Sequence, residues 1–227
     1  MLADMAISSI ATPPARHFTA KGLATRERIV DAASTLILEQ GVNAAKLDDI
    51  QAAARVSASQ LYHYFEDKSA LLLAVIDHQT EVVLGTHRPV LERLDSFQAL
   101  QEWRDVIVAS VEAQHCIGGC PLGSLVSGLA ESDELARGAL ANSFAEWEQL
   151  LRVGLETMRD QGELRPDVDT ETLALSILAG VQGGLLLSQT RRDSVAVRAA
   201  VDTAIAHLWT LRGSAAPGRK AAKGLTN

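Results

Sequence analysis

Polar side chains without formal charge are gathered in one short stretch of the chain, residues 57–63. They are Ser57, Ser59, Gln60, Tyr62 and His63. Hydroxyl, amide and imidazole groups can hydrogen-bond to base edges in a DNA groove or to phosphate oxygens. Cations that could neutralise phosphates flank the stretch: Lys46, Arg55 and Lys68. The chemistry predicted here is contact with DNA, and the alternative is an ordinary solvated helix face.

Two short helices joined by a tight turn are expected to position these groups. Apolar residues from Leu47 to Ala54 recur at three- and four-residue spacings, which predicts one helix. Val56 falls out of step, and Ser57 offers a side-chain oxygen where a second helix could begin. From Leu61 onwards the apolar face resumes. Such a pair is a helix-turn-helix, whose second helix enters the major groove of DNA.

A longer helix is predicted before this pair, from about Thr25 to Gln40, where it would brace the helix-turn-helix. Gly41 supplies its stop signal. Residues 1–20 contain Pro13 and Pro14 and show little periodicity, so they are predicted to form a flexible arm.

Residues 22–75 resemble the DNA-binding domain of the TetR family of bacterial transcriptional regulators. The most diagnostic part is VSxxxLYHYFxxKxxL, from Val56 to Leu71. The resemblance implies that the polar and cationic residues above contact DNA. Arg55 stands where the family usually has Gly, which predicts a left-handed backbone there. Ser59 replaces a frequent Gly, and Lys46 stands where Ser or Thr commonly touches phosphate.

The resemblance also implies how the whole chain is divided. Asp67 is predicted to cap a helix over residues 68–85, which in the family links the DNA-binding domain (21–67) to a helical ligand-binding and dimerisation domain (68–211). Pro89 and Asp95–Ser96 bound the next connection. Further helices are predicted at about 96–115, 121–130, 133–161, 169–190 and 194–211, which makes the fold all-α. Residues 212–227 are predicted to be disordered.

A looser resemblance covers most of the body. The segments GGCPLGSL (118–125), WRD from Trp103 and QGGLLLSQTRRD (182–193) are similar to a TetR branch that includes regulators of multidrug exporters. The family implies a homodimer formed by the last two helices, and internal core packing is the alternative for their faces. These small-residue and aliphatic faces are Ile177, Gly180, Val181, Gly184 and Leu185, then Val197, Val201, Ala204, Ile205 and Leu208.

A regulator needs a second site whose occupancy changes its DNA-competent population. The middle helices place large apolar side chains and a few polar ones on shared faces, which suits a mostly apolar pocket for a small-molecule effector. The alternative is ordinary core. The candidates are Trp103, Ile107, Val111, His115, Phe144, Trp147, Leu151 and Gln182.

Cys116 and Cys120 suggest a different trigger, through oxidation or, with His115, through metal binding. Gly118 and Gly119 are predicted to break any helix between them. Zinc would need a third or fourth protein ligand, and the chain has no CxxC pair, so no metal site is predicted.

Two other classes of function remain as alternatives. An enzyme would use a cysteine with His115, but these neighbours point roughly 100° apart on a helix. The chain also lacks a phosphate loop, a nucleophile elbow and a recognisable paired-carboxylate site, so we predict neither an enzyme nor a cofactor. A helical adaptor protein is the other alternative, and salt-sensitive binding to duplex DNA would distinguish a regulator from it.

The net charge of −7 is unevenly distributed along the chain. Residues 71–211 carry 10 basic and 20 acidic side chains, whereas residues 1–70 carry 7 and 8. The acidity is therefore predicted to lie away from the DNA surface. No run approaches the roughly 18–20 apolar residues of a membrane span, and residues 1–20 lack a signal-peptide pattern. The sequence predicts a cytoplasmic protein that does not bind membranes.

Overall fold

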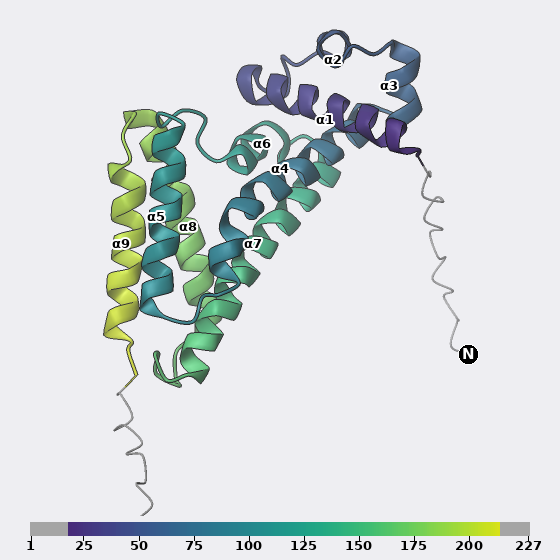
Figure 1. Ribbon diagram of the computed structural model, residues 1–227. Coiled ribbons are helices and arrows are strands. Elements are labelled where there is room, and N and C mark those ends of the chain that lie inside the picture. Colours follow the sequence, from purple (N-terminus) through teal and green to yellow (C-terminus); the bar gives the residue numbers. More distant parts are fainter. Residues whose placement is uncertain (1–17, 214–227) are drawn as a thin grey trace, which may run out of the picture.

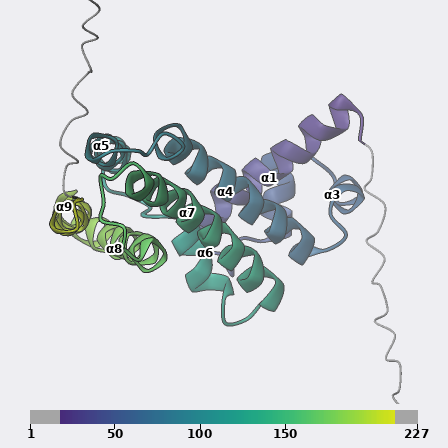
Figure 2. The same ribbon diagram turned by 90° about the horizontal axis from the view of Figure 1, so that it is seen from below.

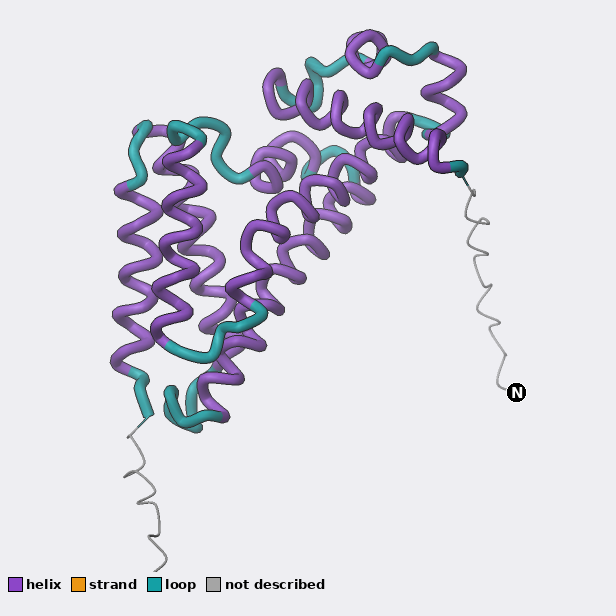
Figure 3. The backbone as a smooth tube through the Cα atoms, viewed as in Figure 1, coloured by secondary structure: helices purple, strands orange, loops and turns teal. Residues whose placement is uncertain are grey.

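The computed structural model describes residues 18–213, and this part of the chain is helical (Figures 1 and 3). Its β-type pairing is limited to a single bridge between Leu164 and Arg212. The predicted all-α fold is confirmed. The helices are α1 (Ala20–Gln40), α2 (Leu47–Ala54), α3 (Ala58–Tyr64), α4 (Lys68–Leu91), α5 (Phe97–Ala113), α6 (Pro121–Leu129), α7 (Glu134–Asp160), α8 (Thr170–Arg191) and α9 (Val195–Thr210).

The helices α1, α2 and α3 form one end of the molecule, at the upper right of Figure 1. Helix α1 begins at Ala20 rather than at Thr25, because the Thr19 hydroxyl caps it by accepting from the Gly22 amide at 3.2 Å. Its buried face, which includes Ile29, packs against α2 and α4. The helix stops at Gly41, whose φ of 87° only glycine adopts at little cost.

Helix α4 connects this end to the rest of the molecule. The predicted cap is confirmed, since the Asp67 carboxylate accepts from the Ala70 amide at 2.8 Å. The predicted end at Gly85 is wrong, because α4 continues through Pro89 to Leu91. Proline removes one helical donor. The carbonyl that loses its partner belongs to Gly85, which is exposed, so water can replace the bond.

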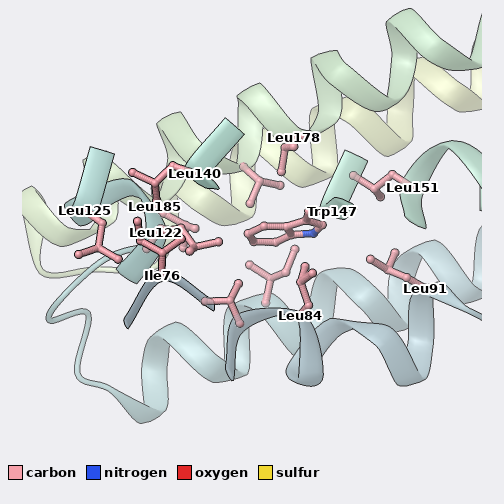
Figure 4. Close-up of a cluster of buried hydrophobic side chains, with 14 of the residues drawn as sticks. Ile76, Leu84, Leu91, Leu122, Leu125, Leu140, Trp147, Leu151, Leu178 and Leu185 are labelled. Atoms are coloured by element: carbon pink, nitrogen blue, oxygen red, sulfur yellow. The ribbon is translucent and has the colours of Figure 1, made fainter. Parts of the chain in front are cut away.

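The remaining helices form the body, in which α4 and α7 run side by side and α5, α8 and α9 lie together (Figures 1 and 2). Their ends lie close to the predicted bounds. Trp147 of α7 is 1% exposed and lies among apolar side chains from α4, α6 and α8 (Figure 4). This cluster joins the linking helix to the centre of the body.

The faces of α8 and α9 that were predicted to form a dimer interface are mostly buried within one chain. Their side chains fill the core between these helices and α5 and α7; Val197 and Leu208 are completely buried. A Cβ on Gly184 would lie only 2.7 Å from the Val197 Cα, so glycine permits this close approach. Internal core packing, the alternative stated above, is therefore correct for most of these residues.

Helix α8 is also more apolar than expected. It is long and apolar enough to cross a membrane, with a mean hydropathy of 1.4 over an 18-residue window that is 39% buried. A core helix meets the same criterion, and α8 packs against both α7 and α9. The high hydropathy reflects a helix with one buried face and one exposed apolar face.

The end of the described chain is held to the body. The Leu211 carbonyl accepts from the Arg165 amide at 3.0 Å, and the Gly213 amide donates to the Glu163 carbonyl at 3.0 Å. Residues 212 and 213 are therefore ordered, against the prediction. The rest of the predicted tail (214–227) and residues 1–17 of the predicted arm lie outside the described residues.

Candidate nucleic-acid interface and effector cavity

The start of α3 is fixed by a reciprocal pair of hydrogen bonds. The Ser57 hydroxyl accepts from the Gln60 amide at 3.2 Å, and the Gln60 side-chain oxygen accepts from the Ser57 amide at 2.9 Å. This capping box satisfies two donors that the first helical turn leaves open. The Ser57 and Ser59 hydroxyls are 3.1 Å apart. The side-chain oxygens of Ser57 and Gln60 thus stabilise the start of the helix. The side-chain nitrogen of Gln60, Nε2, belongs to an exposed residue and is not used in the cap.

The rest of α3 presents its polar side chains outward. Leu61 is completely buried and Phe65 is 3% exposed, whereas Tyr62 is 51% exposed. Ser59 and His63 are also exposed. The ring of Phe18 lies 5.1 Å from that of Tyr64 and 6.0 Å from that of His63, which ties the end of α3 to the start of α1. The structure therefore brings all the predicted α3 residues to one accessible surface.

The turn between α2 and α3 adopts the predicted strained backbone. Arg55 has φ 55° and ψ 50°, the left-handed conformation that its family position led us to expect. A non-glycine residue adopts this conformation at a cost of about 1–2 kcal/mol. The turn leaves the Arg55 side chain exposed beside α3.

The other two predicted cations are also exposed. Lys46 precedes α2 and makes no side-chain hydrogen bond to cap it. The Lys68 ammonium at the start of α4 donates to the Val42 carbonyl at 3.5 Å. Both charges therefore stand near helix N-termini, although Asp48 and Asp49 occupy the first turn of α2.

A cavity of about 100 Å³ lies in the body among α4, α5, α7 and α8, next to the start of α6. Three of the predicted pocket residues line it: Ile107, Val111 and Trp147. The other residues lining it are Val82, Val83, Thr86, His87, Ser110, Gln114, Gly119, Cys120, Pro121, Val181 and Leu185.

The other predicted pocket residues lie elsewhere. Trp103 and Leu151 are completely buried in the core, and Phe144 is half-buried against it. His115 is exposed in the turn after α5, with φ 52°. Gln182 lies against Gly123 of α6. None of these five lines the cavity.

His87 is the main cavity residue that sequence reasoning missed. Its ring stacks on Trp147 at 4.6 Å between centroids, and burial lowers its pKa to about 4. The imidazole is therefore neutral at pH 7. The predicted end of the linking helix at Gly85 hid this residue. A helix extended through Pro89 would have placed His87 on the same face as Val83.

The two cysteines are separate, buried thiols. The chain between them is not helical, as predicted, because Cys116, Gly118 and Gly119 all have positive φ. Burial raises the pKa of the Cys120 thiol, which keeps it protonated. Among residues 18–213, no group of three or more His, Cys, Asp or Glu side chains could hold a metal ion.

Comparison with known proteins identifies the two parts of the chain. Residues 29–75 match the family model described as "Bacterial regulatory proteins, tetR family", and residues 96–204 match "Tetracyclin repressor-like, C-terminal domain". A helix-turn-helix transcriptional regulator from the lacX 3′ region of Lactococcus lactis subsp. lactis is 30% identical over 172 residues, which cover 74% of this chain and 85% of the relative.

The chain belongs to the TetR family. It is a helix-turn-helix transcriptional regulator, which is a class of proteins that are generally not enzymes. The transcriptional repressor DhaR of Mycobacterium sp. strain GP1 is 25% identical, over 74% of this chain and 84% of the repressor.

Solved structures show the same fold. A TetR regulatory protein from Rhodobacter sphaeroides has a TM-score of 0.71 with 21% identity, over 81% of this chain and 98% of that one. A TetR regulator from Chloroflexus aurantiacus has a TM-score of 0.67 with 25% identity, over 86% and 100%. The helix-turn-helix followed by a helical body is thus the architecture shared with these TetR regulators.

Proposed function

We propose that this TetR-family regulator is a cytoplasmic repressor that binds a palindromic operator as a homodimer and is released by a small molecule. The observation that carries the proposal is the capped helix α3, which holds an exposed row of hydrogen-bonding side chains. The relatives of this chain include proteins described as transcriptional repressors, among them DhaR.

In the proposed complex, α3 enters the major groove, where some of its side chains contact bases and others contact phosphates. Tyr62, His63 and Ser59 are exposed and face the bases, and the Gln60 amide nitrogen can donate to an acceptor. Ser57 lies at the helix start, where its exposed hydroxyl can reach a phosphate. The cations Lys46, Arg55 and Lys68 bind phosphates and fix the register of α3.

The dimer is proposed to form through the exposed faces of α8 and α9. These faces carry unburied Leu175, Leu186, Leu187 and Val195, which are 47–63% exposed. A groove of about 530 Å³ lies between the two helices, beside Ser176, Gly180 and Thr203. Pairing two such faces would bury the apolar side chains and present two copies of α3. Copies about 34–36 Å apart would read successive major grooves.

The effector is proposed to act through α4, which contributes to both sites. Val83 and His87 in the second half of α4 line the cavity, and the first turn of the same helix follows α3 directly. Helix α6 offers a second connection, since Pro121 lines the cavity and a Cβ on Gly128 would lie 3.0 Å from Val42. Occupancy that moves either helix changes the position of α3.

Fluorescence anisotropy tests DNA binding with duplexes taken from the DNA upstream of the gene that encodes this chain. Saturable, sequence-selective binding by two chains per site, weakened by salt, is expected. The double variant Tyr62→Ala/Lys68→Ala should lose operator binding and remain a dimer. A matched double variant at exposed positions near the end of α7, far from α3, Gln161→Ala/Arg165→Ala, should bind normally. Retained binding by the first variant would exclude these two residues as the main contacts.

Neither alternative gains support from the described residues. A cysteine-based trigger needs an accessible, deprotonated thiol, and both thiols are buried. An adaptor would bind a protein through the exposed face of α3. Failure to select any DNA from a genomic library would favour the adaptor.

A further inference from the structure

The walls of the cavity carry no formal charge at neutral pH. Among residues 18–213, those that line it include no Asp, Glu, Lys or Arg. Arg88 and Glu146 adjoin the lining residues His87 and Trp147 in the chain but do not line the cavity themselves, and the Arg88 guanidinium pairs with both Glu146 and Glu81. A charged ligand would therefore lose its water without gaining a partner of opposite charge, which strongly disfavours its binding.

The cavity has an apolar floor and a polar, uncharged rim. Ile107, Trp147 and Val181 are at most 2% exposed and form part of the floor. Thr86 and Gln114 are exposed, and Ser110 is half-buried, so hydroxyl and amide groups stand where the cavity meets solvent. A bound molecule thus meets apolar surface at one end and neutral hydrogen-bonding groups at the other.

His87 adds a polar atom to the buried part. It is 7% exposed, and its Nδ1 has no hydrogen-bond partner within the described chain. A neutral imidazole can donate from one nitrogen and accept at the other. By contrast, Figure 4 shows the indole nitrogen of Trp147 on the side of Leu151 and Leu91, within the core. The ring of Trp147 therefore offers apolar surface, and His87, which lines the cavity, offers unused hydrogen-bonding capacity.

The size of the cavity limits its occupant. Its volume of about 100 Å³ is smaller than the roughly 150 Å³ engineered cavity that binds benzene, although this one also opens at its rim. The stacked rings of His87 and Trp147 favour a flat molecule against them. The cavity therefore limits the buried part of an occupant to a single flat ring, and a short substituent would lie at the open rim.

We propose that the effector is a small uncharged molecule with one flat ring and one hydroxyl, carbonyl or amide group, and that carboxylates and amidinium-like cations are excluded. The ring lies on the apolar floor and the polar group meets His87 or the rim at Ser110 and Gln114. This inference rests on the proposed effector-responsive function and specifies the chemical class of its ligand.

Three ring compounds of nearly the same shape test the inference: benzamide (neutral), benzoate (anionic) and benzamidine (cationic at pH 7). Binding is followed by the fluorescence of Trp147 and Trp103 in the full chain carrying Trp209→Phe, because Trp209 lies outside the cavity, stacked on Phe97. Benzamide is expected to bind at least about tenfold more tightly than either ion. Equal or tighter binding of an ion, or no binding of benzamide at millimolar concentration, overturns the proposal.

A pair of neighbouring substitutions tests where the probe binds. Ser110→Asp places a carboxylate on the cavity wall, whereas Ala109→Asp places one on the exposed, non-lining side of α5. Ser110→Asp should shift the preference from benzamide towards benzamidine by about tenfold or more, and Ala109→Asp should not. The same shift in both variants would show that the selectivity does not arise in this cavity. Circular dichroism checks that both variants fold.

The fluorescence assay needs no DNA, which separates this inference from the proposed function. Selective binding of benzamide by a chain that binds no operator would support the ligand class and contradict the repressor mechanism. Operator release by benzoate or benzamidine, but not by benzamide, would support the mechanism and overturn the ligand class.

Discussion

The recognition helix and the effector cavity use polar side chains in opposite ways. On α3 the polar groups are exposed, and the oxygens of Ser57 and Gln60 already complete the helix cap. In the body, four nitrogens are buried without hydrogen-bond partners among residues 18–213: His87 Nδ1, Trp103 Nε1, Trp147 Nε1 and Gln182 Nε2. A buried polar group without a partner typically costs about 1–3 kcal/mol.

Because of this difference, substitutions on α3 and substitutions around the cavity should affect stability and function differently. Ser57 and Gln60 also stabilise the start of α3 through the capping box, whereas exposed groups outside the cap, such as Tyr62, are in contact with water. Replacing Tyr62 therefore changes folding little while removing a proposed DNA contact. The groups around the cavity lie between α4, α5 and α7, so replacing them changes packing and stability together with any ligand response.

Neighbouring residues on α3 provide the strongest test of the contrast. Leu61→Ala should destabilise the protein by about 2–5 kcal/mol, because Leu61 is completely buried. Tyr62→Ala, at a 51% exposed position, should change stability by no more than about 0.5 kcal/mol and still weaken operator binding. Urea denaturation and anisotropy measure the two effects. Comparable destabilisation by both substitutions would contradict the described orientation of α3.

A pH titration tests the buried side of the contrast. Burial lowers the pKa of His87 from 6.5 to about 4. Between these two pH values the His87 imidazole is therefore mostly protonated in the unfolded chain and mostly neutral in the folded chain. Stability should therefore fall as pH decreases from about 6.5 to 4, by about 3 kcal/mol in total from this group. Cys120 in the same cavity stays uncharged throughout this range because burial raises its pKa.

The His87→Phe variant should flatten this dependence, and His115→Phe at an exposed position in the turn after α5 serves as the control. The free energy of unfolding is measured by urea denaturation at a series of pH values. An unchanged slope in His87→Phe would show that another group causes the acid sensitivity.

The smallest expected effect concerns the turn before α3. Arg55→Gly should stabilise the protein by about 0.5–1 kcal/mol, because glycine adopts the left-handed conformation without strain. Operator binding should weaken. The slope of the logarithm of the binding constant against the logarithm of the salt concentration should become shallower by the contribution of about one phosphate contact. Arg55→Lys retains the charge and the strain, so it should keep most of the binding without the gain in stability. Tighter operator binding by Arg55→Gly would exclude a phosphate contact at this position.

Local signals were sufficient to predict most of the helices and the polar face of α3. Ser57, Asp67 and Gly41 mark helix ends through bonds or dihedral angles that involve only nearby residues, and the structure places helix ends at each. The left-handed turn at Arg55 was predicted from the family resemblance, because the family usually has Gly at this position. These features depend on neighbours in the chain, so the sequence pattern contains them.

Long-range packing decided what the pattern left open. The residues Val197 and Leu208 could have faced a second chain or the core, and only the packing of α9 against α5 and α8 places them inside. His87 becomes a cavity residue because α4 continues past Pro89 and meets α7, where the ring stacks on Trp147. Sequence alone thus determined the family, the helical fold and the exposed polar groups of α3. Tertiary structure decided which apolar faces are buried and where a neutral cavity forms, because the buried faces and the cavity depend on contacts between residues far apart in the chain.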